Sequence, residues 1–188
     1  WGIAVDNAGN SYVVGQTLSS NFPTANPLQP TNRSHGDNVF VTKFSPVGSI
    51  VYSTYLGNEN GGVAFGVAVD ALGQAYITGR AETGFPTTPS AFQRVSKDGD
   101  AFVAKLSADG SALLYSTFLG GSHWAEEAYG IAVDNEGNAY VVGKTASIDF
   151  PIVNGAQSSF GGKVLADRGD AFVAKLNPSG SNLIYSTY

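Results

Sequence analysis

Several residue types that carry chemistry are missing or scarce in this sequence. Cysteine is absent, which excludes disulfides, thiolate metal sites and a cysteine nucleophile. Charged residues make up only 13% of the chain, and the formal net charge of −5 comes with no cluster of Lys or Arg. We therefore expect no nucleic-acid partner. The apolar runs are shorter than the roughly 20 residues that a membrane-spanning helix needs, so the sequence predicts no membrane span.

Methionine is also absent, which bears on the origin of the chain. Because Trp1 cannot directly follow an encoded start within this sequence, we expect a processed or excised piece of a longer protein. Trp1 also takes the place that Phe65 and Tyr129 hold in the repeats described next. This position at a repeat boundary leads us to expect further repeats in the parent chain.

The residues that are plentiful favour β-structure. Gly (24), Tyr (9) and Phe (11) are common, and 43% of the chain is hydrophobic, as is typical of strands joined by tight turns. The motif Gly-(Ile/Val)-Ala-Val-Asp begins at Gly2, Gly66 and Gly130, which gives two spacings of 64 residues. Each copy then has four further motifs in the same order. A Gly-x-x-Tyr run begins at Gly9, Gly73 and Gly137, and a Phe-Pro pair begins at Phe22, Phe85 and Phe150. A Phe-Val-x-Lys run begins at Phe40, Phe102 and Phe172, and a Tyr-Ser-Thr end begins at Tyr52, Tyr115 and Tyr185. A long repeat without helical periodicity predicts an array of β units.

Each copy contains four segments that we predict to be strands. In the middle copy they span 65–70, 75–79, 100–106 and 112–118, and they form two hairpins separated by a longer loop over 82–99. In the segment 100–106, Phe102, Ala104 and Leu106 fall on one face, and Ala101, Val103 and Lys105 on the other. The first segment is apolar on both faces, so we expect other elements to cover both of its sides.

A four-stranded meander in each repeat is typical of a β-propeller blade. The sequence thus predicts an all-β fold, a β-propeller segment of three four-stranded antiparallel blades over 1–55, 65–118 and 129–188. A β-solenoid is the main alternative. Because propellers close with roughly four to eight blades, we expect either adjacent repeats of the parent chain or a second copy of this chain to complete the ring.

The third copy is also similar to a known repeat. Its pattern resembles the bacterial SBBP repeat, the so-called seven-bladed β-propeller repeat, on residues 129–134, 137–143, 150–151, 169–176 and 185–188. The resemblance implies a secreted or surface-exposed bacterial protein, often large and modular, with no general catalytic activity and no agreed catalytic residues. The first copy departs from the pattern, because Asn38 stands where Asp100 and Asp170 stand in the other copies.

Two kinds of charged residue recur in every copy. Asp6, Asp70 and Asp134 end the first predicted strand, where we expect each carboxylate to form an Asx turn with the following backbone. The alternative is a ring of carboxylates that binds a weak cation through oxygen ligands. A lysine recurs on the third strand, and we expect its stem to lie along the sheet with the ammonium group in water, at Lys43, Lys105 and Lys175.

The candidate ligand-binding residues lie in the connection over 119–128. They are His123, Trp124, Glu126 and Glu127, of which the first two have no counterpart in the preceding connection. An exposed Trp can stack on a sugar ring while nearby carboxylates and an imidazole bind its hydroxyl groups. The alternative is that Trp124 covers the blade edge while His123 is solvated.

Together these patterns favour a non-catalytic extracellular scaffold at the bacterial cell surface. We expect no catalytic residue, no cofactor and no resident metal, because the two histidines, His35 and His123, lie in different loops and no established catalytic motif occurs. The expected partners are other copies of the chain or adjacent repeats, or a surface protein or polysaccharide. The alternatives are a carbohydrate-binding module and a fragment of a glycan-active hydrolase or lyase.

Overall fold

The computed structural model describes residues 1–123, 126–162 and 169–188. The regular structure of these ranges consists of β-strands, which confirms the all-β fold. The strands are β1 (Gly2–Val5), β2 (Ser11–Thr17), β3 (Asn38–Phe44), β4 (Ile50–Leu56), β5 (Gly62–Val69), β6 (Ala75–Ala81), β7 (Asp100–Leu106), β8 (Leu113–Leu119), β9 (Glu127–Val133), β10 (Ala139–Thr145), β11 (Asp170–Leu176) and β12 (Leu183–Thr187).

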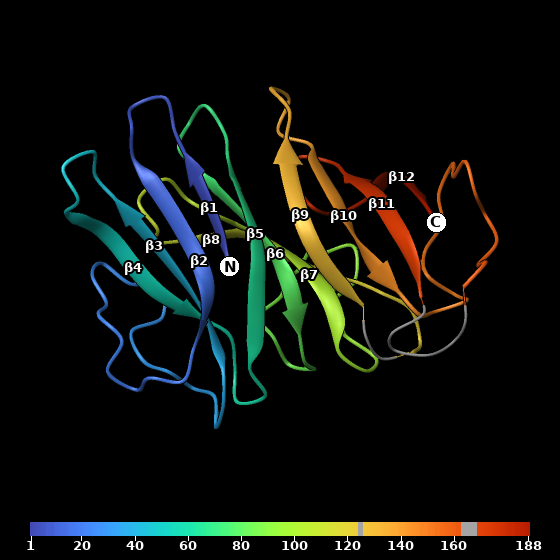
Figure 1. Ribbon diagram of the computed structural model, residues 1–188, viewed down its shortest axis with the longest axis horizontal. Helices are drawn as coiled ribbons and strands as arrows, with labels where there is room; N and C mark the ends of the chain where they lie inside the picture. Colours follow the sequence, from blue (N-terminus) through green and yellow to red (C-terminus); the bar gives the residue numbers. More distant parts are fainter. Residues whose placement is uncertain (124–125, 163–168) are drawn as a thin grey trace.

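Each repeat folds into its own four-stranded antiparallel sheet. The strand orders are β1-β2-β3-β4, β5-β6-β7-β8 and β9-β10-β11-β12, and we name these sheets blades 1, 2 and 3. The blades stand side by side in sequence order, with blade 2 between the other two (Figure 1). In the described ranges every ladder joins strands of one repeat, whereas a solenoid would pair strands of successive repeats. The chain is therefore a β-propeller segment.

Blade 2 illustrates why the predicted and observed strands differ slightly. Strand β7 has the predicted bounds, but β5 begins at Gly62, before the predicted start at residue 65. The extension follows a shift of register between Ala64 and Gly66, after which Gly62 and Val63 still pair with β6. At the shift, a Cβ on Gly79 would lie 2.8 Å from the Cα of Ala64. The strand glycine therefore accommodates a bulge in its neighbour.

The blades pack face to face, and blade 2 contributes to a hydrophobic core on each side. Phe102, Ala104 and Leu106 of β7 belong to the core shared with blade 1. Ala101 and Val103, on the opposite face of the same strand, belong to the core shared with blade 3. The two faces of β7 are therefore covered by different blades.

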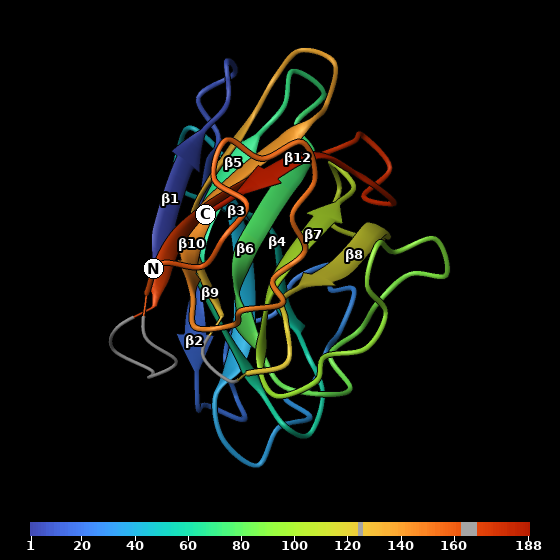
Figure 2. The ribbon, with the colours of Figure 1, turned by 90° about the vertical axis from the view of Figure 1, so that its right-hand side faces the viewer.

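The first strands of the blades lie next to one another. Strand β5 contacts both β1 and β9, and in Figure 1 it lies between them. In Figure 2, which looks along the row of blades, β1 and β9 lie on the left and β8 on the right. Val67 of β5 is buried, but most other residues of this strand are only half-buried. Strand β5 is therefore less completely covered than its apolar sequence predicts, because β1 and β9 cover only part of its two sides.

The long loop of each blade folds back on its own sheet. The ring of Phe85 is buried with its centroid 4.5 Å from that of Phe102, and Phe150 lies 4.6 Å from Phe172 in the same way. The loop backbone also bridges to the fourth strand, and a repeated glutamine N–H binds a threonine hydroxyl there, at Gln29, Gln93 and Gln157. These contacts cover the outer edges of the sheets, which would otherwise be open to pairing with another strand.

Candidate functional site

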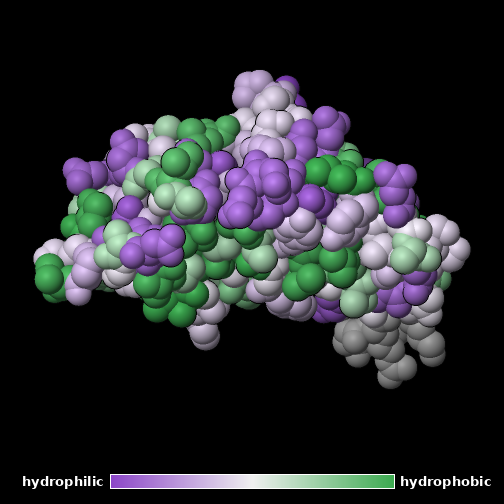
Figure 3. Space-filling view, turned by 90° about the horizontal axis from the view of Figure 1, so that it is seen from above, coloured by the Kyte–Doolittle hydropathy of each residue, from purple (hydrophilic) through white to green (hydrophobic). Residues whose placement is uncertain are grey.

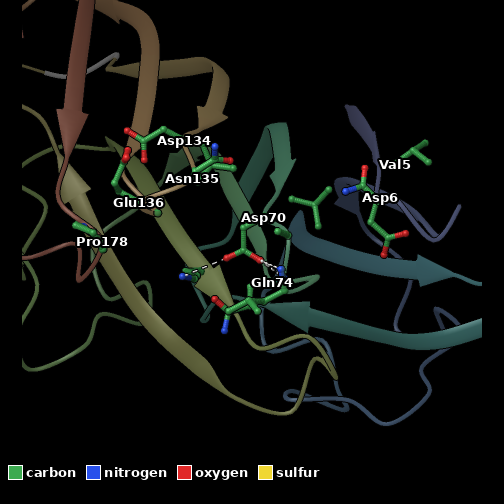
Figure 4. A pocket seen from close by; sticks show the side chains of 15 residues that line it. Val5, Asp6, Asp70, Gln74, Asp134, Asn135, Glu136 and Pro178 are labelled. Carbon is green, nitrogen blue, oxygen red and sulfur yellow. Dashed lines mark hydrogen bonds and ion pairs between the residues drawn. The ribbon is translucent and has the colours of Figure 1, made fainter.

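The turns that follow the first strands meet at one end of the molecule. They line a pocket of about 360 Å³ that includes Asp6, Asp70 and Asp134, together with Lys105 and Pro178 (Figure 4). Seen from above, this end of the molecule has hydrophilic residues gathered near its middle (Figure 3). The repeated aspartates of three different blades therefore line one pocket.

Each repeated aspartate fixes its own turn. One carboxylate oxygen of Asp70 accepts the N–H groups of Leu72 at 3.0 Å and of Gln74 at 2.9 Å. Asp6 makes the equivalent bonds with Ala8 and Asn10. Because a carboxylate that binds two turn N–H groups holds the hairpin bend, these contacts confirm the Asx-turn interpretation.

The second oxygen of each aspartate binds a tyrosine of the adjacent strand. Tyr12, Tyr76 and Tyr140 donate their hydroxyl groups to the aspartate six residues earlier, at 3.0, 3.2 and 3.0 Å. Although desolvation opposes it, the bonds from Asn138 and Tyr140 hold the pKa of Asp134 below its ordinary value. This aspartate is therefore held in its charged form.

The repeated lysines complete these contacts. The ammonium nitrogens of Lys43, Lys105 and Lys175 lie 4.9, 4.6 and 4.6 Å from the ring centroids of the same tyrosines. Lys105 also pairs with Asp70 at 3.5 Å, and its side chain is only 12% exposed. The prediction of a solvated ammonium group was therefore wrong, because the aromatic ring and the carboxylate replace much of its water.

We name these residues the Asp–Tyr–Lys sets: Asp6, Tyr12 and Lys43; Asp70, Tyr76 and Lys105; and Asp134, Tyr140 and Lys175. The set of blade 1 also reaches blade 2. Tyr12 donates to the carbonyl oxygen of Gly73 at 3.0 Å, and Lys43 donates to that of Ala108 at 3.3 Å. Both acceptors lie in turns of blade 2, so this set links two blades as well as the strands of one.

The cation alternative receives no matching ligand geometry. Within residues 1–123, 126–162 and 169–188, no three His, Cys, Asp or Glu side chains are close enough to hold a metal ion together. Both oxygens of Asp6 bind donors of its own turn and strand. The main chemical capacity of the arrangement is thus to hold turns, strands and blades in place.

The residues of the predicted ligand-binding loop have different surroundings in the structure. Trp124 lies outside the described residues, and the backbone N–H of His123 donates to Ser147 Oγ at 2.9 Å. Glu126 is fully buried, with Oε1 accepting from Thr145 at 2.8 Å. Its carboxylate is therefore not accessible to a surface ligand. Whether the loop binds a ligand stays a prediction.

Glu127, the last residue of that prediction, lies at the start of β9. It forms an ion pair with Lys144 at 3.6 Å and accepts a hydrogen bond from the hydroxyl of Tyr129. These partners sit on the surface of blade 3. Glu126 and Glu127 therefore point into different surroundings, and only Glu127 is half-exposed.

A buried carboxylate pair between blades 2 and 3 was not predicted. Desolvation and the nearby charge of Glu126 raise the pKa of Asp100 to about 7, and burial also raises the pKa of Glu126. Gln93 donates to Asp100 at 2.7 Å, but Oδ1 of Asp100 has no hydrogen-bond partner among the described residues. Asn38, at the equivalent place in blade 1, has no charge to desolvate. The replacement of this aspartate by asparagine in the first copy was the sequence feature that could have drawn attention to the buried carboxylate.

Comparison with known proteins finds a match to a family model. Among the residues described, no helix is long and apolar enough to cross a membrane. No curated protein matches the chain. The family model described as SBBP, a beta-propeller repeat, matches residues 2–23 and 115–151. These segments contain the first hairpin of blade 1 and, in blade 3, the corresponding hairpin. Over these two segments the chain is therefore similar to the SBBP beta-propeller repeat.

Proposed function

We propose that the chain is a non-catalytic extracellular scaffold that presents variable loops on a rigid array of blades. The observation that carries the proposal is the internal use of the Asp–Tyr–Lys sets. In each blade the carboxylate binds its turn and its tyrosine, and the lysine lies over that tyrosine. Because the repeated charged residues bind partners within their own blades, we assign them a structural role. We therefore expect the residues that recognise a partner to be among those that differ between the copies.

The variable segments support the interaction part of this proposal. The long loops differ in length between blades, and the connection over 119–128 contains His123 and Trp124, which the preceding connection lacks. Surface loops on a rigid β scaffold are common places for binding groups. The likeness to SBBP repeats supports a location outside the cell, and adjacent repeats or a surface protein are the partners that we propose.

A polysaccharide assay tests the non-catalytic part. The chain is incubated separately with soluble xylan, a β-glucan and solubilised peptidoglycan, and new reducing ends are measured against a heat-denatured sample. The proposal predicts no difference between the two samples. Release of reducing ends that is abolished by Asp134→Asn, in a variant with an unchanged circular dichroism spectrum, would favour the glycan-active enzyme instead.

Calorimetric titration with the same polysaccharides tests the carbohydrate-binding alternative. The scaffold proposal predicts no saturable heat for the native chain. Saturable binding that Trp124→Ala removes, while the thermal midpoint stays within the error of the measurement, would replace the scaffold by a carbohydrate-binding module. An aromatic side chain that anchors a ligand contributes roughly 1–3 kcal/mol to binding.

The location is tested on the cells that make this protein. An antibody raised against this chain should label intact cells as strongly as permeabilised ones. Labelling that requires permeabilisation would contradict an extracellular role without affecting the assignment of the fold.

A further inference from the structure

Two buried carboxyl groups lie at the connection that joins blade 2 to blade 3. Asp100 begins β7 of blade 2, Glu126 directly precedes β9 of blade 3, and both residues are fully buried. Each carboxyl has one bonded oxygen, since Asp100 accepts from Gln93 and Glu126 accepts from Thr145. Oδ1 of Asp100 and Oε2 of Glu126 have no hydrogen-bond partner among the described residues. Two buried acceptors are therefore left without a donor in this part of the chain.

Both carboxyls hold this connection in place. Gly120 packs on Asp100 near the start of the connection, where a Cβ would lie 2.5 Å from Oδ1 of Asp100. The Gln93 amide strengthens this contact, because its nitrogen donates to Asp100 at 2.7 Å and its oxygen accepts the N–H of Gly120 at 3.0 Å. Near the other end, Thr145 of β10 donates to Glu126 at 2.8 Å. The connection is therefore fixed to blade 2 at Asp100 and to blade 3 at Glu126.

The charged groups near the two carboxyls are paired with one another. These ion pairs are Arg80 with Glu82 at 2.7 Å, Lys97 with Asp149 at 3.5 Å, and Lys144 with Glu127 at 3.6 Å. Tyr188 donates to the carbonyl oxygen of Ser147, and His123 donates its backbone N–H to Ser147 Oγ. Among the described residues, no ion pair includes Asp100 or Glu126. In this part of the chain neither carboxyl therefore has a positive group to offset a buried negative charge.

The junction between blades 1 and 2 has a carboxyl at neither of these positions. The pairing of the first strand of a blade with its second fixes which positions correspond. The first junction has Asn38, Gly62 and Ala81 where the second has Asp100, Glu126 and Thr145. The two acids and the hydroxyl that binds one of them thus occur together at one junction and are all replaced at the other. Because blade 1 packs on blade 2 without them, they are not needed to build a junction.

The packing at Asp100 favours a proton over a metal ion as the compensating positive charge. Calcium takes roughly six to eight oxygen ligands at about 2.3–2.6 Å, whereas the backbone of Gly120 already lies against Oδ1 of Asp100. Within the described ranges no three acidic or histidine side chains are close enough to hold a metal ion. Burial raises the pKa of both carboxyls, with a further contribution from Glu126 at Asp100 and from Asp149 at Glu126. A proton needs no shell of ligands, so it fits this packing.

From this arrangement we propose that Asp100 and Glu126 together retain one proton while the junction of blades 2 and 3 is closed, and that loss of this proton loosens the junction. Ionising both groups buries two negative charges under one connection, and hydrating them requires the connection to separate from the blades. The junction of blades 1 and 2 has no such pair and should stay closed. The array then has one joint that depends on pH, at the connection where we expect recognition. Only this last role rests on the proposed scaffold function.

The direction of the pH effect follows from the proton that the closed junction holds and the open junction releases. Hydrated carboxyls of the open junction ionise near pH 4, whereas Asp100 of the closed junction has a pKa of about 7. The closed junction is therefore fully favoured below about pH 4 and progressively less favoured as the pH rises to about 7. Opening should be rarest in acid and most frequent above pH 7.

Hydrogen exchange followed by mass spectrometry at pH 5 and pH 8 tests the joint, after correction for the intrinsic pH dependence of exchange. Amide protection in β7 and β9, at the second junction, should fall by roughly 10–100-fold between the two pH values. Protection in β3 and β5, at the first junction, should stay unchanged. Equal losses at both junctions, or unchanged protection at the second, would overturn the proposal.

Variants in the same experiment identify the groups that hold the proton. Asp100→Asn, which copies Asn38 of the first junction, and Glu126→Gln should each reduce the fall in protection, and the double variant should abolish it. Asp98→Asn is the matched control, since Asp98 is an exposed acid in the same loop, and it should keep the native fall. A fall that persists in the double variant would contradict the assignment to this pair.

Addition of calcium chloride or EDTA at pH 8 distinguishes the proton from a bound cation. The proposal predicts the same protection of β9 in the native chain with calcium, with EDTA and with neither. Protection that calcium restores and EDTA removes would replace the proton by a cation site and overturn the proposal. A joint that fails these tests would leave the scaffold proposal standing, because the polysaccharide assays test that proposal separately.

Discussion

The ring of Tyr115 in blade 2 lies against Gly180 in the β11–β12 turn of blade 3, where a Cβ would overlap the ring. Tyr52 of blade 1 has the same relation to Gly110 of blade 2. Both glycines have positive φ values, 66° and 73°, so they serve the turn and the junction together. The glycine that permits the hairpin turn of one blade thus also determines how closely the preceding blade can approach.

The first prediction separates these two roles of glycine. Gly110→Ala and Gly48→Ala place the same side chain at similar φ values of 73° and 83°, so each should lose roughly 1 kcal/mol from backbone strain. Only Gly110→Ala also collides with a tyrosine of another blade, which should add about 1–3 kcal/mol.

Urea denaturation measures both costs. Equal losses in the free energy of unfolding would show that the contact with the Tyr52 ring has no energetic weight.

The second prediction concerns the hydroxyl that links two blades. Tyr12 donates both to Asp6 and to the carbonyl oxygen of Gly73 in blade 2, whereas Tyr140 of the described chain donates to Asp134 alone. Tyr12→Phe should therefore lower the free energy of unfolding by about 1 kcal/mol more than Tyr140→Phe does, because it leaves one further acceptor unpaired. Thermal and urea unfolding provide the comparison. A larger loss for Tyr140→Phe would contradict the interblade role.

The third prediction follows from the raised pKa of Asp100. Because the folded chain holds the proton of this carboxyl up to about pH 7, against an ordinary pKa of 3.8, its contribution to stability is fully present below about pH 4. It is lost as the pH rises towards 7. Asp100→Asn, which copies Asn38 of blade 1, should remove this loss and stabilise the chain above pH 7 by roughly 1–4 kcal/mol.

Urea unfolding of the native chain and Asp100→Asn at several values from pH 4 to pH 8 checks this prediction. The difference between the two unfolding free energies should grow with pH in favour of the variant. Asp170→Asn is the matched control, since Asp170 is half-exposed at the same position of blade 3. A difference that does not change with pH would show that the folded and unfolded pKa values of Asp100 are alike.

The parts of the fold that were predictable depend on residues near one another in sequence. The alternation within 100–106 predicted which side chains share each face of β7. The Asx turn of Asp70 was also predictable, because its hydrogen bonds lie within four residues.

The parts that were missed depend on residues distant in sequence. Lys105 lies 35 positions after Asp70, and only the pairing of β6 with β7 places its ammonium group over Tyr76. A lysine on a strand was therefore expected in water. The burial of Glu126 was missed for a similar reason, since a charged residue in a connection is usually solvated. Its surroundings come from Thr145 and from blade 2.

The central claim is that repeated tyrosines hold each blade to a glycine turn of the next. It is tested most directly by a double-mutant cycle between Tyr115 and Gly180, with Tyr115→Leu, Gly180→Ala and the double variant measured by urea denaturation. If the ring blocks the added methyl group, Gly180→Ala should cost about 1–2 kcal/mol less when Tyr115→Leu is present. Equal costs of Gly180→Ala with and without the ring would contradict the account.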